Sequence, residues 1–136
     1  MKRKLLETVS ELKVGKDFAV GNDLVFVPDF KASLTDLFKS KIYTANEIAY
    51  CDLFGDAVLR YASTWAAKEA VYKALKQLTP AAISWKKLEI IREKIAGVPL
   101  VIIHKDSDKY EVSLSISHDG DYVWAVAFIR LTSILP

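Results

Sequence analysis

Residues 65–75, Trp65-Ala66-Ala67-Lys68-Glu69-Ala70-Val71-Tyr72-Lys73-Ala74-Leu75, lie at the centre of the longest helix that the sequence predicts. Ala, Leu, Lys and Glu dominate this stretch, and all four are strong helix formers. Asp56 is placed to cap the start of the helix, and Pro80 ends the pattern after Leu78. Apolar residues occupy nearly every side of it, which is typical of a helix that other elements or another subunit bury.

Two charged residues interrupt this apolar helix. Glu69 and Lys73 project from one side, one turn apart, whereas Ala67, Val71 and Ala74 on the far side suit a core. A Glu four residues before a Lys is also an ordinary pair on solvated helices, where it contributes only about 0.2–0.5 kcal/mol. The helix alone therefore leaves a surface role and a chemical role open.

Composition favours a single domain over residues 1–136. Hydrophobic residues make up 51% of the chain, which is enough for a core. No apolar run approaches the roughly 18 residues that cross a membrane, and the charged N-terminus lacks the apolar region of a signal peptide. We therefore expect a cytoplasmic protein with no membrane partner.

The net charge of +2 comes without a long basic run, which argues against nucleic acid as a partner. One cysteine, Cys51, excludes an internal disulfide and fits a small buried side chain.

The hydrophobic periodicity predicts an α+β fold. Its expected form is an antiparallel sheet of about four to five strands, packed with the long central helix and shorter helices. Thr44 and Glu47 form the pattern of a capping box at the start of one of these helices. The predicted helices cover about 3–13, in an extra N-terminal segment 1–18, then 31–39 and 44–54, and the predicted strands cover 19–27, 85–92, 99–103, 111–117 and 122–131.

Asp23 lies within an apolar strand pattern. A carboxylate in such a place is costly unless it is paired, protonated or bound to a metal. The alternative is that Gly21-Asn22-Asp23 forms a hairpin turn, because Asn and Asp are leading turn residues. The residues themselves leave these two interpretations open.

Three polar clusters thus interrupt apolar elements: Asp23, Glu69 with Lys73, and Ser117 with His118. Two carboxylates from separate elements can hold one Mg²⁺, with waters and phosphate oxygens as the other ligands. A nearby Lys neutralises phosphate charge, and a His takes up a proton near neutral pH. Together the clusters suggest phosphoryl-type transfer. For His118 alone, a turn residue that binds backbone groups is the more common role.

Three segments resemble the motifs of the 4'-phosphopantetheinyl transferases of the holo-acyl-carrier-protein synthase type. Gly21-Asn22-Asp23-Leu24-Val25 resembles the opening Gly-x-Asp-φ-Val motif, and residues 65–75 resemble the motif [FW]-[SA]-A-K-E-A-x-x-K. Ser115-Ile116-Ser117-His118 is similar to the final Ser-φ-Ser-His. Residues 38–51 and 85–99 fit the segments between these motifs. The resemblance implies the 4'-phosphopantetheinyl transferase fold.

The resemblance also implies an activity: Mg²⁺-dependent transfer of 4'-phosphopantetheine from coenzyme A to a serine of an acyl or peptidyl carrier protein, with release of 3',5'-ADP. Such a reaction belongs to fatty acid and lipid biosynthesis. By position, Asp23 and Glu69 would bind the metal. Lys73 would contact coenzyme phosphates and, with the two carboxylates, form the catalytic group. Coenzyme contacts are further implied for Lys68, on the nucleotide side, and for Ser117 and His118.

Short members of this family are homotrimers with sites between subunits, so the resemblance implies the same assembly here. The sequence departs from the family pattern at Asn22, at Asp29 and at Thr64, where the family often has Ile, Arg and Arg, respectively. The last two departures remove basic residues expected to face the carrier. They motivate an alternative: a non-catalytic coenzyme A-binding or assembly module of the same fold.

Overall fold

The computed structural model describes residues 17–92 and 98–132. Within these ranges the chain forms five strands in two sheets, and both sheets contact the long helix α5 (Ala57–Leu78). The α+β class is therefore confirmed, although the strands are divided between two sheets. The predicted helix over 3–13 and the turn at 94–97 lie outside the described residues.

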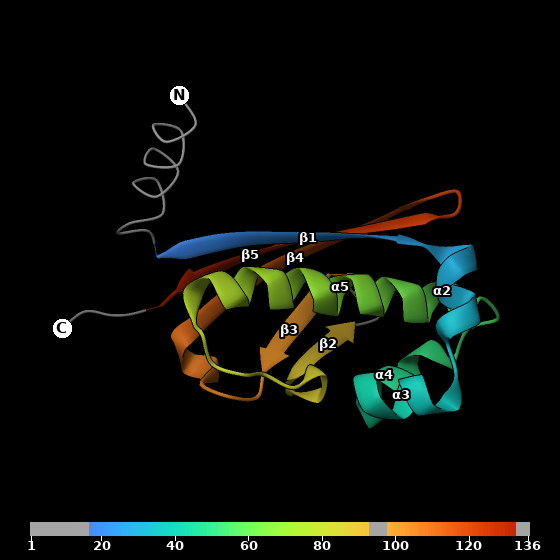
Figure 1. Ribbon diagram of the computed structural model, residues 1–136, viewed down its shortest axis with the longest axis horizontal. Coiled ribbons are helices and arrows are strands. Elements are labelled where there is room, and N and C mark those ends of the chain that lie inside the picture. The colour runs from blue at the N-terminus through green and yellow to red at the C-terminus, as the bar shows by residue number, and fades with distance from the viewer. Residues whose placement is uncertain (1–16, 93–97, 133–136) are drawn as a thin grey trace.

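The larger sheet has the order β1-β5-β4 and is antiparallel throughout. Figure 1 shows the strands of this sheet running along α5, and the hairpin of β2 and β3 lies below the same helix in this view. The strands are β1 (Phe18–Phe26), β5 (Tyr122–Leu131), β4 (Tyr110–Asp119), β2 (Leu88–Arg92) and β3 (Pro99–Ile103).

Strand β1 decides between the two interpretations of Asp23. The backbone of Gly21-Asn22-Asp23 pairs with Ala127, Val126 and Ala125 of β5, respectively, so this segment is strand and not turn. Side chains alternate along β1, and its inner face, with Asp23, is directed to α5. The outer face of the sheet carries exposed large apolar side chains: Phe18, Val20, Leu24, Phe26, Tyr122, Trp124 and Phe128.

Gly21 sets how closely β1 approaches α5. A Cβ atom at this position would lie 2.1 Å from the carbonyl oxygen of Ala70 and 2.6 Å from the amide nitrogen of Ala74. Atoms of a helix backbone cannot move away singly, so only glycine fits between these two elements. The contact lies two residues before Asp23 and one residue after Glu69, which brings their segments together.

Three short helices gather at one end of α5 (Figure 1). They are α2 (Val27–Ser33), α3 (Asp36–Ile42) and α4 (Ala45–Cys51). The prediction of one helix over 31–39 is wrong, because Thr35 accepts a hydrogen bond from the amide of Phe38 and starts a new helix. The predicted capping box of Thr44 and Glu47 is confirmed. Asp56 precedes α5, but its carboxylate contacts Arg60 instead of capping the helix.

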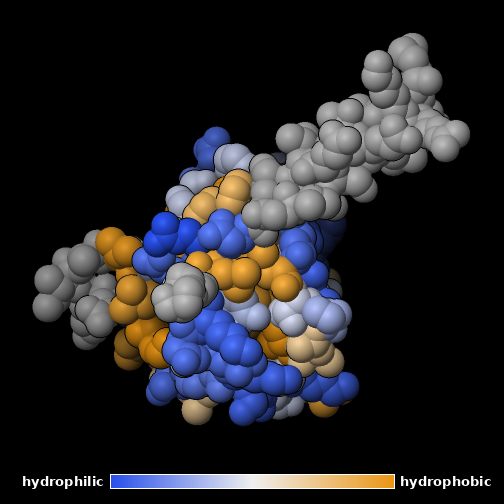
Figure 2. All heavy atoms as spheres, turned by 90° about the vertical axis from the view of Figure 1, so that its left-hand side faces the viewer, coloured by the Kyte–Doolittle hydropathy of each residue, from blue (hydrophilic) through white to orange (hydrophobic). Residues whose placement is uncertain are grey.

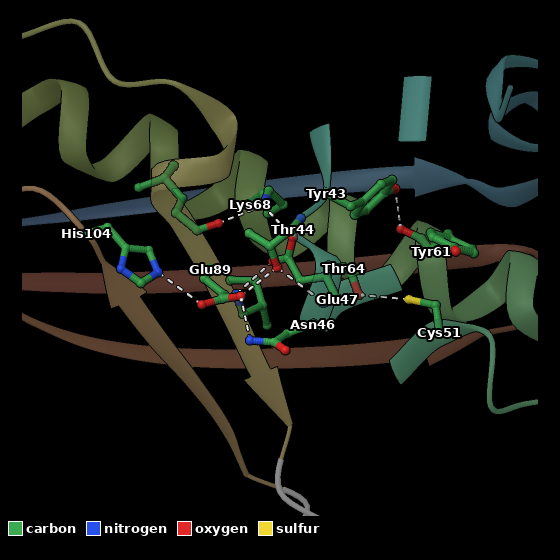
Figure 3. Close-up of polar contacts among 12 residues, drawn as sticks. Tyr43, Thr44, Asn46, Glu47, Cys51, Tyr61, Thr64, Lys68, Glu89 and His104 are labelled. Carbon is green, nitrogen blue, oxygen red and sulfur yellow. Dashed lines mark hydrogen bonds and ion pairs between the residues drawn. The ribbon is translucent and has the colours of Figure 1, made fainter. Parts of the chain in front are cut away.

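A buried polar network joins α4, α5 and β2 (Figure 3). Lys68 of α5 donates to Glu47 of α4 and to the carbonyl oxygen of Leu88. The other oxygen of Glu47 accepts from the amide of Ile90. The Nζ atom of Lys68 and both carboxylate oxygens of Glu47 thus have hydrogen-bond partners, as buried charges require. The remaining core is mainly apolar, and it includes Cys51, as expected.

Candidate active site

Asp23 and Lys73 form an ion pair between β1 and α5. The Nζ atom of Lys73 lies 2.9 Å from Oδ1 of Asp23 and 3.1 Å from the carbonyl oxygen of Asn22. The side chain of Asp23 is 16% exposed, whereas that of Lys73 is 49% exposed. A carboxylate in an apolar strand is thus paired, as its position demands, and the ammonium group still reaches solvent.

Glu69 lies on the same side of α5 and shares a cavity with Asp23. We call it the carboxylate cavity; its volume is about 460 Å³, and it is also lined by Phe26, Asp29 and Trp65, among others. Burial and the nearby charge of Asp23 raise the pKa of Glu69, while Lys73 lowers it. The two carboxylates, far apart in the sequence, therefore act on one another electrostatically.

This donor set fits a hard divalent cation. In the described ranges of the chain, no cluster of three or more His, Cys, Asp or Glu side chains is placed to hold a metal ion. A cation between Asp23 and Glu69 would therefore take its other ligands from waters or from a bound phosphate. Two carboxylates with waters and phosphate oxygens are the set that Mg²⁺ commonly takes. The chemistry of the residues and the expected metal agree.

Ser117 and His118 lie near the end of strand β4, which ends at Asp119, and do not line the carboxylate cavity. His118 donates from Nε2 to the carbonyl oxygen of Gly120 at 3.0 Å, so the histidine does bind turn backbone. Its side chain also lines a second cavity of about 480 Å³, which we call the arginine cavity. The residues around that cavity are Tyr50, Asp56, Leu59, Arg60, Ser63, Arg92, Pro99, Ile116, Ser117 and His118.

The arginine cavity combines two guanidinium groups with hydroxyl groups and an apolar floor. Arg60 and Arg92 supply positive charge, Ser63 and Ser117 supply hydroxyls, and Ile116 is apolar. Cations and hydroxyl groups bind phosphate oxygens, and apolar side chains suit a base. Sequence reasoning did not single out Arg92 or Ser63, because only the fold brings the end of β2 to the start of α5.

Lys68 is not part of either cavity, which corrects the expectation that it reaches the nucleotide. Its side chain is fully buried, and Nζ lies 2.7 Å from Oε1 of Glu47 and 2.7 Å from the carbonyl oxygen of Leu88. Burial lowers the pKa of Lys68, although the charge of Glu47 opposes this. His104 also contacts a carboxylate outside both cavities, because its Nε2 atom lies 3.0 Å from Oε1 of Glu89.

The outer face of the larger sheet is apolar and uncovered in the described chain. Leu24 is 61% exposed and Trp124 is 50% exposed, and they are opposite each other on β1 and β5. Figure 2 views the end of the molecule where β1 begins and β5 ends, and hydrophobic residues reach the surface there. No helix in the described residues is both long enough and apolar enough to pass through a bilayer. An uncovered apolar face of this extent is typical of a protein interface.

Comparison with known proteins matches these features to one family. Residues 19–127 match the family model described as the 4'-phosphopantetheinyl transferase superfamily. The chain is 34% identical over 122 residues to the holo-[acyl-carrier-protein] synthase of Aquifex aeolicus, covering 84% of this chain and 99% of that protein. It is also 33% identical over 133 residues to fatty acid synthase subunit alpha of Saccharomyces cerevisiae, covering 91% of this chain and 7% of that one.

Among solved structures, the chain is similar to the ACPS–CoA complex of Chronobacterium ammoniagenes. The TM-score is 0.73 with 26% sequence identity, and the match covers 85% of this chain and 98% of that one. The synthase from Neisseria meningitidis has a TM-score of 0.70 at 24% identity, which supports the fold.

Proposed function

The chain belongs to the 4'-phosphopantetheinyl transferase superfamily, and we propose that it transfers the 4'-phosphopantetheine group of coenzyme A to a serine of an acyl carrier protein. The observation that carries this proposal is the carboxylate cavity, where Asp23 and Glu69 meet beside Lys73. Relatives named as holo-[acyl-carrier-protein] synthases support the substrate class, and a related structure that holds coenzyme A supports the donor.

In this reaction the serine oxygen attacks the phosphorus that carries pantetheine. A new P–O bond forms, the bond to the bridging oxygen breaks, and 3',5'-ADP leaves. Asp23 and Glu69 would hold Mg²⁺, which when bound neutralises negative charge on the diphosphate. Lys73 is exposed enough to donate to a diphosphate oxygen in the same place. Charge stabilisation and positioning are the main requirements of phosphoryl transfer, and these residues supply both.

The serine must also lose a proton. Glu69 is the acceptor in this proposal, acting through a water that it holds. Glu69 suits this role by position, because it lines the carboxylate cavity together with Asp23.

The nucleotide half of coenzyme A would bind in the arginine cavity, beside Ser117 and His118. That cavity and the carboxylate cavity share no lining residue in one copy of the chain. A second copy packed on the apolar outer face would allow one complete site to form from two subunits. The proposed assembly is the homotrimer that the family resemblance implies, and the exposed apolar side chains of the outer face offer a surface for neighbouring copies.

The direct test is incubation of the full chain with coenzyme A, Mg²⁺ and acyl carrier proteins, followed by mass spectrometry of each carrier. A mass gain equal to phosphopantetheine, dependent on Mg²⁺, is expected. Coenzyme A binding without any mass gain on acyl or peptidyl carriers would favour the non-catalytic alternative instead. The departures at Asp29 and Thr64 make the choice of carrier the part to vary first.

A further inference from the structure

Asp29 is a third carboxylate in the lining of the carboxylate cavity, and it differs from the other two. It is exposed in the first turn of α2, whereas the side chain of Asp23 is 16% exposed and pairs with Lys73. In residues 17–92 and 98–132, no side chain forms an ion pair or a hydrogen bond with the carboxylate of Asp29. Its charge is therefore free to act on a molecule that enters the cavity.

Asp29 does not join the pair of carboxylates that would hold Mg²⁺. The charges that shift the pKa of Glu69 are those of Asp23 and Lys73, and the charge of Asp29 is not among them. Nowhere in the described parts of the chain do three acidic side chains lie close enough together to hold one metal ion. The exposure of Asp29 instead places it at the solvent side of the cavity, away from the metal pair.

The cavity provides no positive charge to compensate Asp29. The described lining contains no Lys, Arg or His, and four of its residues are aromatic: Phe26, Phe30, Phe38 and Trp65. A basic side chain that entered here would meet a carboxylate with its charged end and aromatic rings with its alkyl stem. An acidic side chain would meet a like charge, which costs affinity. The entrance therefore suits a cationic group.

Under the proposed function, the residues next to the acceptor serine also come to this entrance. The serine must reach the diphosphate at Asp23 and Glu69, and it is part of a carrier protein chain. Successive Cα atoms are only about 3.8 Å apart, so the side chains that flank the serine enter the cavity with it or lie at its edge. Asp29 lines the same cavity, so it acts on the charge of these flanking residues.

We propose that Asp29 selects carriers with a basic residue beside the acceptor serine and disfavours carriers with an acidic residue there. This inference rests on the proposed function, which brings the carrier to the carboxylate cavity. No bond forms or breaks at Asp29, so the residue acts on recognition of the carrier. Its substitution should change the KM for the carrier and leave kcat nearly unchanged with saturating carrier.

The test uses one acyl carrier protein in two versions, with Lys or with Glu at both positions that flank the acceptor serine. Calorimetry measures the binding of each version to the full chain, and mass spectrometry measures the transfer from coenzyme A. The wild type should bind the Lys version about 3- to 10-fold more tightly, as expected for partly exposed charge contacts. Asp29→Lys should reverse this preference, and Asp29→Asn should reduce it to about twofold or less. High salt should weaken the preference of the wild type.

Asp36→Lys is the matched control. Asp36 is also an exposed acidic residue in the first turn of a short helix, but it does not line the carboxylate cavity. This variant should keep the wild-type preference for the Lys version. The proposal is overturned if the wild type binds the two versions equally, prefers the Glu version or binds neither, or if Asp29→Lys keeps the wild-type preference. Binding needs no turnover, so a failure of the proposed transferase activity would appear separately, as the absence of any mass gain on carriers.

Discussion

Lys68 and Glu47 form an ion pair whose two side chains are both fully buried, with Nζ 2.7 Å from Oε1. Removing one partner of such a pair leaves an uncompensated charge in the core, so Lys68→Met should lower the free energy of unfolding by about 3–5 kcal/mol. Urea denaturation measures this loss. The double variant Glu47→Gln with Lys68→Met should lose less than the two single losses added together. Simple additivity within about 0.5 kcal/mol would show that the two groups are not coupled.

Gly21 should tolerate no side chain. The Cβ of Gly21→Ala would overlap the helix backbone at Ala70, so this variant should lose about 1–3 kcal/mol or more of stability. Gly55→Ala is the matched control, because a Cβ at Gly55 meets nothing within 4 Å. Thermal denaturation of the two variants checks the prediction, and equal melting temperatures would contradict the close contact.

Glu69→Ala should abolish Mg²⁺-dependent transfer while leaving the assembly intact. Under the proposed function this carboxylate is both a metal ligand and the proton acceptor, so we expect the rate to fall by at least about 100-fold. Carrier mass spectrometry gives the rate, and sedimentation gives the oligomeric state. Glu111→Gln, at an exposed carboxylate paired with Arg130, should retain activity if the effect is specific. An unchanged rate in Glu69→Ala would remove this residue from the mechanism.

The decrease in the free energy of unfolding at acid pH should depend on Glu89. Burial acts to raise its pKa, but hydrogen bonds from Thr44 and His104 outweigh this, and the net pKa is lowered. In the folded protein Glu89 therefore stays ionised below pH 4.5, where it is protonated in the unfolded chain. Its contribution to stability is present above that pH and is lost as the pH falls through the lowered value.

Glu89→Gln should consequently flatten the pH dependence of the free energy of unfolding below pH 4.5. One proton accounts for at most about 1.4 kcal/mol per pH unit. Urea denaturation at a series of pH values from 6 to about 3 measures the slope. Persistence of the full wild-type slope in Glu89→Gln would assign the acid sensitivity to another group.

Oligomer formation should depend on the outer face of the sheet. Leu24→Asp places a charge where 61% of the side chain is exposed, so the folded subunit should persist while its packing against other copies is lost. Leu53→Asp is the control, because Leu53 is similarly exposed but lies outside the sheet. Sedimentation should show a smaller species only for Leu24→Asp. A wild-type chain that is itself monomeric would contradict the assembly.

Local patterns were enough to predict much of the fold. The capping box at Thr44 and the long helix follow from short-range periodicity and cap chemistry, whereas the sequence left a strand and a turn open at Asp23. Asp23 and Glu69 could be paired from the sequence because each carboxylate interrupts an apolar element. Residues 31–39 could not be predicted in detail, since Thr35 can cap a helix or continue one.

The sequence could not predict which way the Lys68 side chain points from the helix, for a different reason. A helix that is apolar nearly all round gives no periodicity from which to place one charged residue. The partner, Glu47, already had a local role as the third residue of a capping box, and its second role arises only in the tertiary fold. Arg92 is a similar case, because its cavity is assembled from α4, α5, β4 and the β2–β3 hairpin.

The strand–helix contact at Gly21 has a consequence for the chemistry as well as for stability. Asp23 follows this contact on β1 and Glu69 precedes it on α5, so the packing distance of two backbones also fixes the spacing of two charged groups. Protein engineers who widen or fill that contact to alter the core would change the size of cation that the carboxylates can share.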